Sequence, residues 1–237
     1  TFQKDDKPLN FIEHYDRFKW AKDKIIYITV PDLPFKKTWD NEALQRSQIL
    51  CCKTQYKAQD GLIHISDVDE IPSIEALEQA KEICLAHDGE AYVRLWLKRY
   101  MYYLNVRRDA KWCHNVVFNS YLYPQINIIH DNLFQKHIPT CVNITENAGW
   151  HWSFMGGADE VKYKLSTASC HIEYNIPEIV NDNWISDCVT NLHNVMALKT
   201  DEPKPTDRMW VTEIDDTYPK YILEHPEIFS KHIYVGG

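Results

Sequence analysis

The stretch Leu62-Ile63-His64-Ile65-Ser66-Asp67-Val68-Asp69-Glu70-Ile71-Pro72 decides how the rest of this chain is interpreted. Its first residues are mostly apolar, which predicts a buried strand, and Pro72 ends that strand. Asp67 and Asp69 follow two positions apart, so on an extended backbone both carboxylates would point the same way. Carboxylates suit Mg²⁺ or Mn²⁺, which proteins hold through one or two carboxylates together with substrate phosphates. The alternative is a pair of solvated carboxylates at a strand end.

The composition describes an ordinary globular chain and argues against nucleic acid as a partner. Of the 237 residues, 44% are hydrophobic and 25% are charged, and the net charge is -8. A nucleic-acid-binding protein would carry a basic stripe instead. No apolar run approaches the roughly 20 residues that cross a bilayer, so the sequence predicts no transmembrane segment.

The seven cysteines indicate the compartment. Their number is odd and no pair has C-x-x-C spacing, which argues against a zinc cage. Several lie in apolar contexts, where free cysteine behaves as a small hydrophobe. A reducing, cytoplasmic location is favoured, with the Golgi lumen as the alternative if a membrane anchor lies upstream.

Strand and helix patterns alternate along the chain. Ser73 is a good helix N-cap after Pro72, and the helix that follows should end near His87. Further strands are predicted at residues 24–30, 90–106, 116–123 and 149–155, and further helices at 39–51, 159–169 and 177–198. This alternation predicts an α/β fold with a mostly parallel sheet flanked by helices, whose ligands bind beyond the carboxyl ends of the strands.

A second dense stretch, residues 148–160, surrounds two tryptophans and a histidine with glycines, which let backbone approach a ligand closely. Here the chain resembles glycosyltransferase family 17. The matching segments are residues 24–30, Trp39-x-x-Glu42-x-x-Gln45-Arg46, residues 65–72, Tyr102-Tyr103-Leu104-Asn105, and Gly149-Trp150-His151-x-Ser153 through Lys164-Leu165 to His171-x-Glu173. Their common order makes the resemblance specific.

The resemblance implies a GT-A-like, Rossmann-like fold and inverting transfer from a nucleotide-sugar to a glycan acceptor. A UDP-sugar is the expected donor, with UDP-N-acetylglucosamine as the first guess. Asp67 and Asp69 match the family's metal motif, and His171 matches a later histidine that helps to hold the metal or the diphosphate. Asp159 and Glu160 lie where such enzymes carry their catalytic base, with Glu173 as the next candidate.

The remaining site residues are expected to contact the donor or the acceptor. Arg46 or Lys164 would donate hydrogen bonds to phosphate, although Arg46 reads equally well as a surface arginine of its helix. Trp150 or Trp152 would pack against the sugar or the acceptor. His151 is a candidate donor-binding residue, with a buried core histidine as the alternative.

A single glycosyltransferase domain is expected over residues 1–237. Residues 1–110 form its nucleotide- and metal-binding half, 111–200 its acceptor side and 201–237 a C-terminal tail. The family usually has a strand, a helix and another strand before the region that matches Thr1. This N-terminal unit is missing from the sequence, and either residues encoded upstream or a neighbouring chain is expected to supply it.

Two other functions remain open at this point. One is a non-catalytic glycosyltransferase-like domain that binds glycans or a partner. The other is a phosphohydrolase that uses the same aspartates, which would need more metal ligands nearby than the sequence offers.

Overall fold

In the computed structural model, the residues whose structure is described are 11, 14–29, 38–48, 61–87, 90–120, 122, 140–167, 174–197 and 208–236. Within these ranges no helix is both long and apolar enough to cross a membrane.

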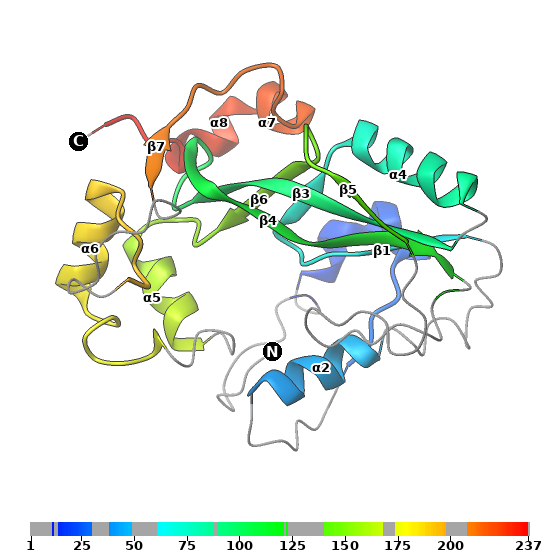
Figure 1. The fold of residues 1–237 in the computed structure, drawn as a ribbon. Helices are drawn as coiled ribbons and strands as arrows, with labels where there is room; N and C mark the ends of the chain where they lie inside the picture. Colours follow the sequence, from blue (N-terminus) through cyan, green and yellow to red (C-terminus); the bar gives the residue numbers. More distant parts are fainter. Residues whose placement is uncertain are drawn as a thin grey trace.

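In this part of the chain, seven strands form one sheet at the centre of the molecule (Figure 1). They are β1 (Leu62–Ile65), β2 (Glu70–Pro72), β3 (Ala91–Met101), β4 (Val106–Asn119), β5 (Thr140–Ile144), β6 (Gly149–Ser153) and β7 (Met209–Val211). The long strands β3 and β4 pair with each other in the middle. β5 and β6 pair with β3 on its other side, β1 and β7 pair with β4, and β2 pairs with β6.

The expectation of a mostly parallel sheet is wrong, because the sheet is mixed. Among the described strands, β5 and β6 run parallel to β3, whereas the four other pairings are antiparallel. The chain passes from β3 to β4 through residues 102–105. Such a short connection can join only antiparallel neighbours, since a parallel crossover needs a dozen residues or more.

The sheet curls, and its topology explains why. β1 and β2 follow each other in sequence but lie at opposite ends of the strand order β1-β4-β3-β6-β2. Four strand spacings across a flat sheet would be about 19 Å. The link from Ile65 to Glu70 contains a tight turn, in which the Glu70 N–H donates to the Asp67 carbonyl at 3.1 Å, so it spans only about 14 Å. The two edges must therefore approach each other on the side of this turn.

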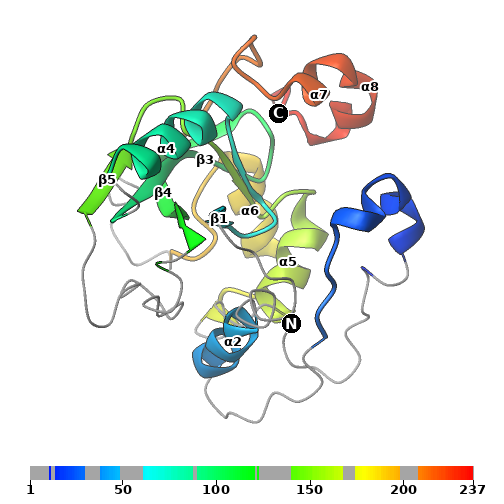
Figure 2. The same ribbon diagram turned by 90° about the vertical axis from the view of Figure 1, so that its right-hand side faces the viewer.

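The described helices and 3-10 segments lie around the sheet. They are η1 (Tyr15–Lys24), α2 (Thr38–Ser47), α4 (Ile74–Ala86), α5 (Ala158–Thr167), α6 (Asp182–Asn191), α7 (Lys220–Glu224), α8 (Pro226–Phe229) and η5 (Ser230–His232). Both views place α4 and α2 on opposite sides of the sheet (Figures 1 and 2).

The helix predicted after Pro72 is confirmed as α4. The Ser73 hydroxyl accepts a hydrogen bond from the Ala76 N–H at 3.1 Å, and His87 is the C-terminal cap. Ala80 and Cys84 on α4 are fully buried and belong to one apolar cluster with residues of β3 and β4. A second cluster joins Val161 and Leu165 of α5 to α6 and the end of β3.

Two predicted elements differ from the structure. Lys24 ends η1, and residues 25–29 form no strand, because none of the described strands supplies hydrogen bonds to them; Val30 lies outside the described residues. The helix predicted over 177–198 is limited to α6. The Asn181 side chain caps its start by accepting from the Trp184 N–H, and Leu192 ends it with a left-handed backbone at φ 55°.

The elements predicted at 39–51, 90–106, 149–155 and 159–169 correspond to α2, β3, β6 and α5 with shifted boundaries, whereas the strand predicted at 116–123 coincides with β4 only over residues 116–119. Residues 49–51, 121, 123, 168 and 169 lie outside the described residues. Residues 208–236, within the expected C-terminal tail, add β7 to the sheet as well as α7 and α8.

Candidate functional site

The candidate site is built on the acidic turn, residues Asp67–Glu70. The backbone hydrogen bond that closes it is reinforced from the side, because the Asp67 N–H donates to Glu70 Oε2 at 2.8 Å. Val68 stands fully exposed at the tip. The sequence argument assumed an extended backbone here, and that premise is wrong: Asp67 and Asp69 lie on a turn and contact different partners.

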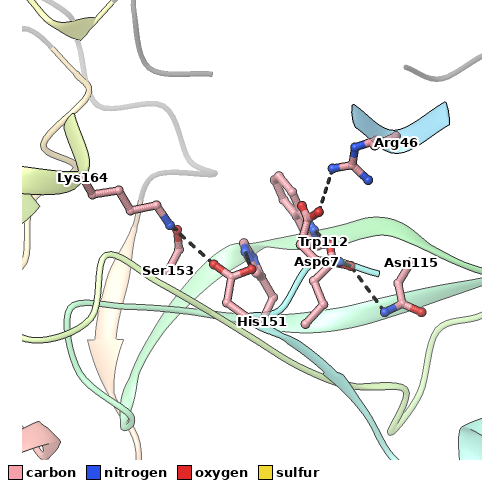
Figure 3. A network of polar contacts seen from close by, with 9 residues as sticks. Arg46, Asp67, Trp112, Asn115, His151, Ser153 and Lys164 are labelled. Atoms are coloured by element: carbon pink, nitrogen blue, oxygen red, sulfur yellow. Dashed lines mark hydrogen bonds and ion pairs between the residues drawn. The ribbon is translucent and has the colours of Figure 1, made fainter. Parts of the chain in front are cut away.

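Asp67 contacts Arg46 of α2. An Arg46 guanidinium nitrogen donates to Asp67 Oδ1 at 2.7 Å (Figure 3). The Asp67 side chain is 42% exposed, so solvent screens this ion pair and it adds little to stability, at most about 1 kcal/mol. The ion pair holds Arg46 at the acidic turn.

Asp69 contacts Lys164 and His151. Lys164 Nζ lies 3.4 Å from Asp69 Oδ2 and also donates to Ser153 Oγ at 3.2 Å. His151 Nε2 lies 3.7 Å from Asp69 Oδ1, longer than a hydrogen bond. Burial raises the pKa of Asp69, but His151 and Lys164 outweigh burial and lower that pKa below its usual value. Asp69 is therefore a carboxylate at neutral pH, with Lys164 as its cation.

A strained turn delivers Lys164 to this position. After β6, Phe154 has φ 56°, and Gly156 and Gly157 have φ 110° and 101°. Glycine adopts such angles readily, whereas phenylalanine does so at a cost. The turn directs α5 back along the sheet, and Lys164 Nζ lies 5.0 Å from the centre of the Phe154 ring. This contact brings α5 and the end of β6 together.

Glu70 is the buried member of the acidic turn, with 4% of its surface exposed. Its Oε1 accepts a hydrogen bond from the Trp112 indole N–H, and its Oε2 accepts from Asn115 Nδ2 at 3.4 Å (Figure 3). Burial, aided by the charges of Asp67 and Asp69, raises the pKa of Glu70 to about 7, although the hydrogen bonds from the Asp67 N–H and the Trp112 indole N–H act to lower it. Sequence reasoning gave Glu70 no role, although its place directly after the aspartate pair was a signal.

His151 lies beside this network on β6, where it pairs directly with Glu70 of β2. Its ring stacks on Trp112, with centroids 4.4 Å apart and planes inclined by 20°. The side chain is 5% exposed, and its Nδ1 has no hydrogen-bond partner among the described residues. Burial lowers the pKa of His151 despite the opposing pull of Asp69. The imidazole is therefore neutral at pH 7.

Trp150 does not belong to the polar network around the acidic turn. Adjacent residues of a strand point to opposite faces, so Trp150 faces away from His151. It stacks on Trp152 with centroids 5.9 Å apart and belongs to an apolar cluster with Tyr218 and Ile222. Its position is that of a core tryptophan.

The structure describes only two of the three candidate bases. Asp159 and Glu160 are both exposed in the first turn of α5. His171 and Glu173 lie outside the described residues. Within the described ranges, no three His, Cys, Asp or Glu side chains form a group that could hold a metal ion by themselves.

A mixed α/β sheet with an acidic turn between basic side chains is compatible with an enzyme that transfers sugars. The family model of Glycosyltransferase family 17 matches residues 1–203. The chain therefore belongs to glycosyltransferase family 17, and this membership supports glycosyltransferase activity. Neither a curated protein nor a solved structure gave a significant match.

Proposed function

We propose that this protein transfers a sugar from a nucleotide-sugar to a glycan acceptor, with Mn²⁺ or Mg²⁺ held by the acidic turn. UDP-N-acetylglucosamine is the first donor to test. The observation that carries this proposal is the setting of Asp67 and Asp69 between Arg46 and Lys164. Two carboxylates flanked by two long cationic side chains match a metal diphosphate, which carries both signs of charge.

The donor set fits a divalent cation shared with phosphate. The acidic turn offers hard carboxylate oxygens two residues apart, and the raised pKa of Glu70 reflects burial together with repulsion among carboxylates. A divalent cation relieves such repulsion. Asp67 and Asp69 would hold it, and the small number of protein ligands suits a metal that also binds phosphate oxygens. When bound, the metal would act as a Lewis acid that neutralises the departing diphosphate.

Arg46 and Lys164 would bind the phosphates directly. Both reach the acidic turn from helices, α2 and α5, on long side chains that are about one-third exposed or less. Exchange of a carboxylate partner for a phosphate oxygen would keep each cation paired. The two helices would then hold the donor from both sides of the turn.

Glu160 is the preferred general base. It precedes Lys164 by four residues on α5 and so lies on the same helix face as the side chain that reaches Asp69. Asp159 shares its face with Tyr163, which is 51% exposed. Inversion needs a carboxylate that removes the proton of the acceptor hydroxyl and no protein nucleophile.

The proposal is tested with a panel of nucleotide-sugars in the presence of Mn²⁺ or of a chelator. We expect metal-dependent nucleotide release from one UDP-sugar, faster with a suitable glycan acceptor. Asp67→Asn and Asp69→Asn should abolish the metal dependence. Absence of release from every donor at high enzyme concentration, together with absence of Mn²⁺ binding, would overturn the proposal.

A further inference from the structure

Trp112 joins the two halves of the acidic turn through different parts of one side chain. Its indole N–H donates to Glu70 Oε1, while Glu70 Oε2 holds the Asp67 N–H at 2.8 Å. Its ring face stacks on His151, which contacts Asp69 at 3.7 Å. Trp112 thus reaches Asp67 through Glu70 and Asp69 through His151, although no hydrogen bond joins it to either aspartate.

The curled sheet allows Trp112 to contact both Glu70 and His151. Trp112 belongs to β4, whereas Glu70 belongs to the edge strand β2 and His151 to β6. In the strand order, β3 separates β4 from β6, and β2 is one strand further. A flat sheet would keep these side chains well apart, because each strand spacing adds nearly 5 Å. Curling of the sheet brings them together at Trp112.

The ring is itself held from several directions. The Arg99 guanidinium carbon lies 5.0 Å from its centre, and the His114 ring centroid is 4.5 Å away. Part of the ring also packs against the apolar cluster under α4. A side chain fixed in this way has few rotamers available, so it can impose an orientation on the groups it contacts.

We propose that Trp112 is a positioning residue of the proposed transfer reaction. It fixes Glu70 by its N–H and His151 by its ring, and so holds Asp67 and Asp69 in the arrangement that receives the metal diphosphate. This inference rests on the proposed function and assigns Trp112 no contact with substrate. The buried Nδ1 of His151, without a partner among the described residues, leaves ring stacking as the main restraint on that imidazole.

The test compares Trp112→Phe with wild type. Phenylalanine keeps an aromatic face for His151 but removes the N–H that Glu70 accepts. Two readouts are needed: Mn²⁺ binding in the presence of UDP, from the electron paramagnetic resonance signal of free Mn²⁺, and kcat at saturating metal. We expect the dissociation constant for Mn²⁺ to rise about tenfold, with kcat at saturating metal changed by less than about threefold.

The matched control is Trp96→Phe. The Trp96 indole N–H donates to Asn143 Oδ1 at 2.8 Å, so this variant also loses an indole hydrogen bond, but one that involves no residue of the acidic turn. Its Mn²⁺ affinity should equal that of wild type. Circular dichroism and thermal unfolding of each variant establish that it is folded.

Each other outcome is decisive. Unchanged Mn²⁺ affinity in folded Trp112→Phe, or a lower kcat with unchanged affinity, would overturn the positioning role. If Trp112→Phe does not fold, Glu70→Gln replaces it, since it perturbs the same hydrogen bonds and keeps the ring stack; unchanged affinity there would equally overturn the role. A wild-type protein without Mn²⁺ binding or nucleotide release would instead remove the proposed function, and the inference with it.

Discussion

Glu70 and His151 face each other across the pairing of β2 with β6, one a buried acid and the other a buried neutral base. Burial moves their pKa values in opposite directions, upward for Glu70 and downward for His151. The uncharged form of each side chain is thereby favoured beside a partly buried pair of aspartates. The contributions of Glu70 and His151 to stability should therefore change in opposite directions with pH, so that substitution of one of them can distinguish the two.

Replacement of either aspartate should remove activity. Asp67→Asn and Asp69→Asn should each lower kcat/KM at least ~100-fold, because stabilisation of the leaving diphosphate is worth several kcal/mol. Steady-state assays with the best donor measure the effect. Asp182→Asn is the control, since Asp182 forms an exposed ion pair with Lys162 at 2.6 Å outside the acidic turn. Near-normal activity in both turn variants would exclude these aspartates as metal ligands.

The two acids of α5 should differ. Glu160→Gln should lower kcat by roughly 100-fold or more, the usual contribution of a general base, while Asp159→Asn should retain most activity. Each variant serves as the control for the other, because both residues are exposed in the same helical turn. The reverse result would transfer the role to Asp159, and full activity in both variants would leave Glu173 to be tested.

Glu70 should make the protein less stable as pH rises. Its folded-state pKa of about 7 lies above the ordinary 4.5, so its contribution is fully present below 4.5 and is lost as pH rises through 7. Linkage with these two values gives a loss of about 2 kcal/mol between pH 5.5 and 8. Urea unfolding of wild type and Glu70→Gln at both pH values isolates this contribution, because the wild type alone should lose it. The lowered pKa of His151 makes its own contribution to stability increase with pH, opposite to that of Glu70. Comparison of wild type with Glu70→Gln cancels the His151 contribution, which both proteins share. An equal stability gap at both pH values would contradict the prediction.

Gly149 should tolerate no side chain. It has φ 130°, and a Cβ atom would lie 2.3 Å from the Ile71 carbonyl oxygen and 2.6 Å from Pro72 Cα. Both atoms belong to the backbone of β2, so relief requires strand separation. Gly149→Ala should lower the free energy of unfolding by more than about 3 kcal/mol, as measured by urea denaturation. Gly61→Ala, where nothing lies within 4 Å, should change it by less than about 1 kcal/mol. Similar stabilities for the two variants would show that β2 and β6 separate at little cost in free energy.

Local patterns predicted the local elements. Ser73 and the apolar spacing after it identified α4, and the glycines at 156 and 157 marked the end of β6. The sheet could not be predicted in the same way, because strand direction depends on pairing between distant segments. Residues 25–29 show the limit: a strand-like composition forms no strand without a neighbour.

The candidate site likewise contains residues that the sequence could suggest and residues that only the folded sheet connects. Residue type and motif proposed five candidate site residues that contact one another in the structure: Asp67, Asp69, Arg46, Lys164 and His151. Glu70, Trp112 and Asn115 were missed because their connection exists only across the curled sheet. The turn geometry was also missed, since two aspartates with one residue between them occur on turns as well as on strands.

The acidic turn is also the covalent link between the two margins of the sheet, because β1 and β2 lie at opposite ends of the strand order. Local opening of the turn and flattening of the sheet are therefore one motion. A ligand that fixes the turn should slow amide hydrogen exchange in both strands to a similar extent, although they lie on opposite margins. Exchange measured with and without metal and nucleotide would then report donor binding as a cooperative closure of the whole sheet.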